Sequence, residues 1–265
     1  MTSAFHRPAS DGPRHLRRVS LRLHPALTDV LNRLDGLPLG QSFKDRAVEL
    51  STTTLLSEPV NRDEALNAYR WLLERAAGDG LPLTQAGYLK PADVQALAGV
   101  MPTMDDWIFA VKLERNAHPV WHFREFMKAV GLLRKYKDTL RTTRIGRECL
   151  ADSEVLWAHL ADRLLFTGSR FDVDASVVVL VHMATSDERL DVDAVARTLT
   201  ELGWQTPDGS PVRTSDVYPV WNELWTAIGN VGPSAGSHRH SRVLSVAAKH
   251  LVSDALFETS DGASG

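Results

Sequence analysis

Apolar residues recur at three- and four-residue steps along most of the chain, which predicts a mainly α-helical protein. The first regular stretch, residues 25–39, is expected to form a helix. A second helix is expected over 62–77, with Asn61 as its N-cap. Residues 40–60 are less regular and are expected to link the first helix to the rest of the protein.

The stretch from His118 to Leu150 predicts a helix, a hairpin and the start of another helix. The apolar face of its first helix is formed by Val120, Phe123, Phe126, Met127 and Val130. Gly131 ends this helix, and two short strands are expected around a turn at Lys137-Asp138. This order of elements is the winged-helix pattern, in which the helix before the hairpin can enter a DNA major groove.

Related helix-turn-helix patterns predict a tandem arrangement. Thr84 and Gly87 have the same spacing as Thr143 and Gly146, and each pair precedes an expected helix. Residues 191–228 hold a third pattern, two helices joined by a turn. We therefore expect a mainly α fold of tandem winged-helix-like units, built of helices with short β-hairpins. The expected organisation is a basic flexible N-terminal arm (1–24), a helical leader and linker (25–60), a first unit (61–104), a second unit with the basic wing (105–170), a third unit (171–257) and a disordered tail (258–265).

One segment fits two kinds of secondary structure. The β-branched run in residues 175–183 has the composition of a buried strand, yet a buried helix would show the same apolar run. Because the neighbouring segments are all helical, we favour a helix packed beneath them.

Composition narrows the classes of function. The net charge of -3 over 265 residues argues against a protein that coats nucleic acid along its whole surface, so any such binding must come from local patches. The single cysteine, Cys149, excludes an internal disulfide and cysteine-rich zinc sites. The sequence has neither a long apolar run nor the apolar core of a secretion signal, which predicts a cytoplasmic protein without a membrane segment.

Residues with catalytic or metal-binding chemistry are sparse. No nucleophile motif surrounds a serine, and Cys149 is expected to pack as a small buried hydrophobic residue. His118 and His122 share a helix face without a glutamate between them, and His238 and His240 lie in a glycine- and serine-rich loop. We therefore expect no enzyme activity, cofactor or metal site.

The clearest local feature is a basic wing, in which six cations face a single acid, Asp138. Its cations are Arg134, Lys135, Lys137, Arg141, Arg144 and Arg147. The first hypothesis is binding of double-stranded DNA, with Trp121, Arg124 and Lys128 facing the groove. In that hypothesis the phosphates are held by Arg134, Lys135, Lys137, Arg141 and Arg144.

The alternative is a non-enzymatic scaffold that uses the face around Trp121 to hold a protein partner. Glu125, on the same face, counts against DNA, whereas the charge asymmetry of the wing counts for it. The sequence indicates no DNA target and no oligomeric state.

From about Asn61 to Leu256 the chain resembles a family of uncharacterised actinobacterial proteins. The stretches that carry this resemblance are LTQAGYLKPADVQAL, HFREFMKAVGLLRKYKDTLRTTRIGRECLADSEVLWAHLADRL, LGWQTPDGSPVRTSDVYPVW and SVAAKHLVSDAL. The resemblance implies no activity. Separately, GLLRKYKDTLRTTRIGR is similar to the end of the recognition helix and the wing of bacterial winged-helix regulators.

Overall fold

Helices dominate the fold, which confirms the prediction of a mainly α protein. The computed structural model describes residues 20–105, 107–187, 190–233 and 243–260. The α-helices in these ranges are α1 (Pro25–Leu34), α2 (Gly40–Leu56), α3 (Arg62–Ala65), α4 (Asn67–Arg75), α5 (Pro91–Ala98), α6 (His118–Ala129), α7 (Arg144–Ala151), α8 (Ser153–Ala161), α9 (Arg170–Ala184), α10 (Val192–Glu201), α11 (Thr214–Ile228) and α12 (Val246–Leu256). The strands are β1 (Ser20–Leu23), β2 (Leu81–Pro82), β3 (Leu133–Tyr136), β4 (Thr139–Thr142) and β5 (Phe257–Ser260), and short 3-10 turns form η1 (Pro102–Met104) and η2 (Glu114–Asn116).

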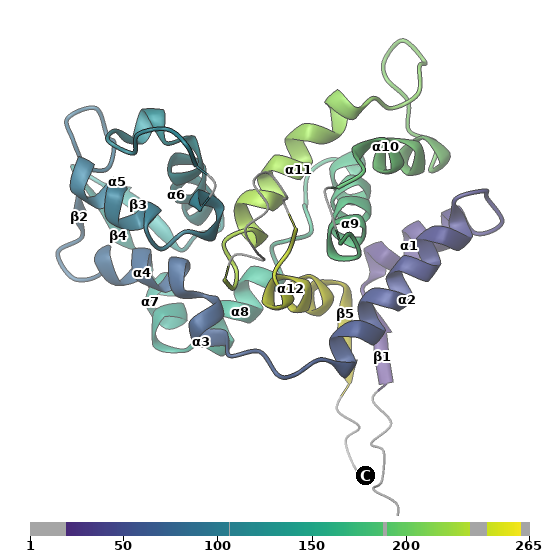
Figure 1. Ribbon diagram of the computed structural model, residues 1–265, viewed down its shortest axis with the longest axis horizontal. Helices are drawn as coiled ribbons and strands as arrows, with labels where there is room; N and C mark the ends of the chain where they lie inside the picture. Colours follow the sequence, from purple (N-terminus) through teal and green to yellow (C-terminus); the bar gives the residue numbers. More distant parts are fainter. Residues whose placement is uncertain (1–19, 106, 188–189, 234–242, 261–265) are drawn as a thin grey trace, which may run out of the picture.

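A three-stranded antiparallel sheet in the order β2-β4-β3 organises one lobe of the molecule. In Figure 1 this lobe lies on the left, with α4, α5, α6 and α7 around the sheet. β2 pairs with β4 through Leu81 opposite Leu140. Segments 61–104 and 105–170, expected from the sequence as separate units, therefore contribute strands to the same sheet.

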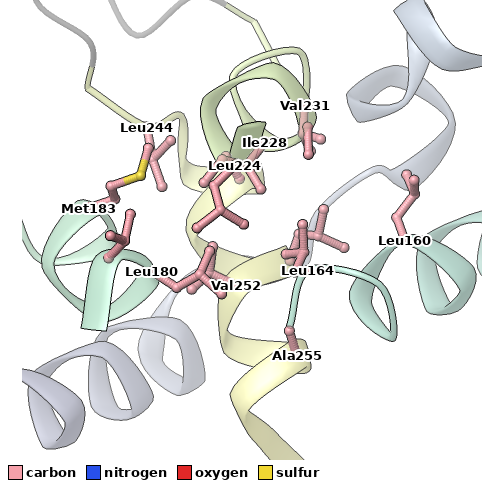
Figure 2. Close-up of a cluster of buried hydrophobic side chains, with 14 of the residues drawn as sticks. Leu160, Leu164, Leu180, Met183, Leu224, Ile228, Val231, Leu244, Val252 and Ala255 are labelled. Atoms are coloured by element: carbon pink, nitrogen blue, oxygen red, sulfur yellow. The ribbon is translucent and has the colours of Figure 1, made fainter. Parts of the chain in front are cut away.

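Helix α9 is the centre of the second lobe, in which it packs against α1, α2, α10, α11 and α12. Its residues from Asp174 to Ala184 are all buried, which confirms the helix expected over residues 175–183. A helix enclosed on every side shows no amphipathic periodicity, and this explains why the pattern also fitted a strand. Figure 2 shows Leu180 and Met183 of α9 near Leu224 of α11 and Val252 of α12.

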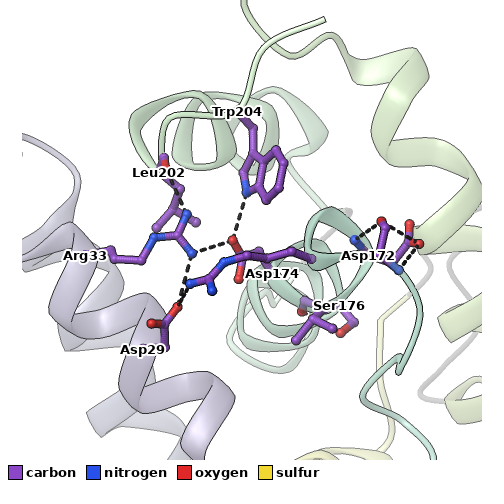
Figure 3. Close-up of polar contacts among 10 residues, drawn as sticks. Asp29, Arg33, Asp172, Asp174, Ser176, Leu202 and Trp204 are labelled. Atoms are coloured by element: carbon purple, nitrogen blue, oxygen red, sulfur yellow. Dashed lines mark hydrogen bonds and ion pairs between the residues drawn. The ribbon is translucent and has the colours of Figure 1, made fainter.

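A buried carboxylate ties α1 and the end of α10 to α9 (Figure 3). Asp174 accepts hydrogen bonds from Arg33 Nη1 at 2.6 Å and from Trp204 Nε1 at 2.8 Å. Arg33 also donates to the carbonyl of Leu202 at 2.8 Å. Asp174 is 3% exposed, so these donors replace the water that a carboxylate would otherwise bind.

The C-terminal end of α11 joins the two lobes. The hydroxyl of Tyr69, on α4, donates to the carbonyl of Ala227 at 2.6 Å. The backbone N–H of Gly232 donates to the carbonyl of Ala65 at 2.7 Å. Because Tyr69 is buried, its hydroxyl requires such an acceptor, and α11 is held against the first lobe.

Residues 40–60, expected to be less regular, are instead helical for most of their length, because α2 occupies Gly40–Leu56. Its buried residues Phe43, Ala47 and Leu50 lie at helical spacing against the second lobe. The serine- and threonine-rich half has weak intrinsic helix propensity, but packing overrides it: Thr54 and Ser253 of α12 are hydrogen-bonded at 2.9 Å.

Two terminal predictions are also wrong where the structure describes them. The flexible arm predicted to reach residue 24 and the disordered tail predicted from residue 258 contain β1 and β5, which pair antiparallel. Arg22 lies opposite Glu258 in this pair, an arrangement of opposite charges that favours the register. The pairing joins segments at opposite ends of the chain, so neither segment alone predicts it. Residues 1–19 of the arm and 261–265 of the tail lie outside the described residues.

Candidate nucleic-acid interface

Helix α6 and the β3–β4 hairpin form the predicted interface. Gly131 follows α6 with φ +78°, a left-handed conformation that suits glycine, and the chain turns directly into β3. The two strands are joined by Lys137 and Asp138 alone, as the sequence predicts. Lys137 has φ +52°, which is uncommon for a residue with a side chain. The hairpin is therefore tight, with an exposed lysine at its tip.

The register of the hairpin separates its cations onto two faces. Arg134 lies opposite Arg141, and Lys135 lies opposite Leu140. Because side chains alternate along a strand, the two arginines project to one face and Lys135 to the other. The ammonium of Lys135 lies beside Gly87, where a Cβ added to the glycine would be 3.2 Å from Nζ. The predicted phosphate-binding residues are thus close in sequence but do not form one continuous cluster.

Tyr136 is a residue that the sequence analysis did not include. Its side chain is 46% exposed at the end of β3. Three cations lie over its ring, with Arg134 Cζ, Lys137 Nζ and Arg141 Cζ at 5.8, 5.5 and 5.3 Å from the ring centroid. An aromatic residue inside the run Arg-Lys-Tyr-Lys was the available signal in the sequence.

The structure corrects the expected position of Arg124. Instead of facing a groove, its side chain is buried, and its guanidinium forms an ion pair with Glu114 at 2.8 Å between Nε and Oε1. Arg124 also donates to the carbonyl of Gly87 at 2.9 Å. Glu114 accepts from the backbone N–H of Leu89 at 2.6 Å. Burial raises the pKa of Glu114, and the Leu89 hydrogen bond and the Arg124 charge oppose that rise. Arg124 therefore holds the turn before α5 against α6.

The exposed face of α6 carries little free positive charge. Trp121 is 36% exposed, so part of its indole reaches solvent. Lys128 forms an ion pair with Glu125 at 2.7 Å, and Glu125 also forms one with the buried Arg124 at 3.1 Å, so the charge of Lys128 is offset. The neighbouring His122 stacks edge-on against Trp121, with ring centroids 4.7 Å apart. Burial, followed by the nearby His118, lowers the pKa of His122, so the neutral imidazole is favoured. Helix α6 also packs against α11, which leaves only part of its surface open.

The start of α7 adds two further cations. The side chain of Arg144 is 83% exposed and lies 3.5 Å from Glu148. Thr143 caps the helix by accepting from the N–H of Gly146 at 2.9 Å. Arg147 is also exposed, and it lies one turn from Thr143 on the same helix. Because Arg144 is paired with Glu148, the positive charge on the first turn of α7 comes mainly from Arg147.

Among the described residues that were candidates for catalysis or metal binding, Cys149, His118 and His122 belong to no metal-binding group. Cys149 is buried, and burial raises the pKa of its thiol, which disfavours the reactive thiolate. Within the described ranges, no group of three or more His, Cys, Asp or Glu is placed to hold a metal ion. The candidates His238 and His240 lie outside those ranges.

None of the helices in the described part of the chain has the length and apolar character needed to cross a membrane.

Comparisons with protein-family models, with curated proteins and with solved structures find no match to this chain.

Proposed function

We propose that residues 62–151 bind double-stranded DNA through the β3–β4 hairpin and the exposed part of α6. The proposal is supported by the order α4, β2, α5, α6, β3, β4 and by the β2-β4-β3 sheet, which resemble the arrangement of a winged-helix domain. In such domains the hairpin and the helix before it face the nucleic acid.

The proposal rests on the positive charge of the hairpin cations, which is not neutralised by neighbouring carboxylates in the described part of the chain. Among the described residues, no carboxylate lies within ion-pair distance of Arg134, Lys135, Lys137 or Arg141. Cations gathered on one exposed hairpin repel one another, and phosphate groups would relieve that repulsion. Because Arg124 is buried and Lys128 is paired with Glu125, the proposed affinity resides mainly in phosphate contacts of the hairpin.

The test is fluorescence anisotropy of the whole chain with a labelled random-sequence duplex over a salt series. The combined replacement of Lys135, Lys137 and Arg141 by alanine should weaken binding strongly and lower the slope of log K against log salt by about 2 to 3. A matched control replaces Lys44, Arg197 and Arg213, three exposed cations of the second lobe, by alanine. Equal loss in both variants would show a general charge effect, and no binding by the wild-type chain at low salt would overturn the proposal.

The second candidate is a protein-interaction scaffold, favoured by the exposed indole of Trp121 on a helix whose neighbouring charges neutralise each other. Such a face suits a partner that buries an aromatic anchor and needs no net charge. The two candidates differ in salt dependence, because binding through Trp121 would change little over the same salt series.

A further inference from the structure

The β3–β4 hairpin contains an arrangement that costs stability. Arg134 and Arg141 are directly opposite each other on antiparallel strands, and like charges in that position are destabilising. The adjoining Lys137 adds a third positive charge and occupies a left-handed conformation that side chains disfavour. Three unfavourable features at one hairpin tip therefore require a compensating interaction.

Part of the compensation comes from Tyr136. Tyr136 shares a face of the hairpin with Arg134, because residues two apart on a strand point to the same side. Arg141 pairs with Arg134 on the opposite strand, so it lies on that face too, diagonally across from Tyr136. The guanidinium groups and the Lys137 ammonium are all within 6 Å of its ring centroid, the range of cation–π attraction. An exposed tyrosine thus holds three like charges close together.

Neighbouring groups fix the position of Arg141. Its Nε donates to the hydroxyl of Thr139 at 3.1 Å, and that hydroxyl donates to the carbonyl of Tyr136 at 2.8 Å. On the other side, Arg141 lies against Gly80, where a Cβ would come within 2.8 Å of Arg141 Cγ. The arginine is therefore held over the ring by its own strand and by the end of the α4–β2 turn.

We propose that Tyr136 organises Arg134, Lys137 and Arg141 into a phosphate-binding cluster at the hairpin tip. The ligand class is the sugar–phosphate backbone, and this inference rests on the proposed DNA function. Because cations already occupy the surroundings of the ring, Tyr136 acts as a positioning residue and does not stack on a base. Its contribution is to keep three donors ready for adjacent phosphate oxygens, so that less side-chain freedom is lost on binding.

The experiment compares wild type with Tyr136→Phe and Tyr136→Leu, with Tyr218→Leu as a control at an exposed tyrosine on α11. Anisotropy with the random duplex across a salt series should show a loss of about three- to tenfold for Tyr136→Leu and a shallower salt slope. Tyr136→Phe and Tyr218→Leu should bind as wild type does, because the first keeps the ring and the second lies elsewhere. Wild-type affinity in Tyr136→Leu would overturn the proposal.

A second readout separates this inference from the proposed function. In NMR spectra, ring currents should shift the side-chain CH2 signals of Arg134, Lys137 and Arg141 in wild type and Tyr136→Phe, and the shifts should vanish in Tyr136→Leu. Titration with tripolyphosphate should move the same signals. If the wild type binds no duplex but the signals respond to tripolyphosphate, the DNA function fails and the cluster stands. If the shifts are unchanged in Tyr136→Leu, or tripolyphosphate moves none of the three signals, the cluster itself is overturned.

Discussion

The guanidinium of Arg124 and the carboxylate of Glu114 form an ion pair of 2.8 Å in which both side chains are almost fully buried. The pair connects the η2 turn to α6, and Arg124 extends the connection to the carbonyl of Gly87. This relationship assigns Arg124 to the support of the proposed interface and not to its surface.

Replacement of Arg124 by alanine should therefore lower stability far more than it alters DNA contacts. It leaves the Glu114 carboxylate buried without its cation, which costs about 3–5 kcal/mol. Urea unfolding followed by circular dichroism measures the loss. Lys128→Ala serves as the control, because the Lys128–Glu125 pair is partly exposed and should contribute less than about 1 kcal/mol. Equal stability of the two variants would contradict a structural role for Arg124.

Trp121→Ala should weaken duplex binding about five- to tenfold while leaving the salt slope unchanged, since the indole carries no charge. The side chain is 36% exposed, so the change in unfolding free energy should be small. Anisotropy over the salt series used for the hairpin variants tests this, with Tyr218→Ala as the control. An unchanged affinity would remove Trp121 from the DNA interface and leave the scaffold hypothesis to account for its exposure.

Acid should destabilise the second lobe through His182. Burial lowers the pKa of His182 to about 4, and the Arg46 charge adds to this effect. The unfolded chain, with an ordinary histidine pKa near 6.5, then binds more protons than the folded chain between these two values. Stability is therefore lost as the pH falls through this window, by about 3 kcal/mol in total.

His182→Leu should remove most of that pH dependence, as measured by urea unfolding at several pH values between 7 and about 4. His118→Leu, at an exposed position on α6, should retain the wild-type dependence. If the unfolding free energy of His182→Leu still falls with pH as it does in the wild type, the acid sensitivity comes from other residues.

Gly146→Ala should destabilise the chain by about 1–3 kcal/mol. A Cβ at Gly146 would lie 2.2 Å from the carbonyl oxygen of Leu132, so α7 would have to move away from the start of β3. Thermal unfolding compares it with Gly99→Ala, where the nearest atom is at 3.5 Å and the melting temperature should not fall. A normal melting temperature for Gly146→Ala would show that this contact relaxes without cost.

Residue patterns predicted the individual helices and strands more successfully than the contacts between them. The spacing of Thr84 and Gly87 matches that of Thr143 and Gly146, but Thr143 is a helix N-cap, whereas Gly87 donates to the carbonyl of Thr84 in a turn. The structural counterpart of that turn is Thr206, whose carbonyl accepts from Gly209 at 2.8 Å. The same three-residue spacing occurs in a helix N-cap and in a turn, and only the hydrogen bonds distinguish the two.

For the candidate site, too, the sequence indicated the residues but not the contacts that they make. Helical spacing placed Arg124 beside Trp121 on α6, and the exposed cations of the hairpin were evident from composition. The burial of Arg124 depends on Glu114, which lies in the preceding turn and approaches α6 only after the chain folds back. Likewise, the grouping of Arg134 and Arg141 around Tyr136 depends on strand register, which residue composition does not specify.

The β1–β5 pair also has a consequence for the order of folding. These strands close a loop that spans nearly the whole chain, and they do so with few residues. Closing such a loop is entropically unfavourable until α1 and α12 have docked on α9, because docking brings the strands together beforehand. The pair should therefore form after the rate-limiting step. Weakening the β1–β5 pairing would accelerate unfolding and leave the folding rate almost unchanged. The two strands therefore stabilise a lobe that has already assembled.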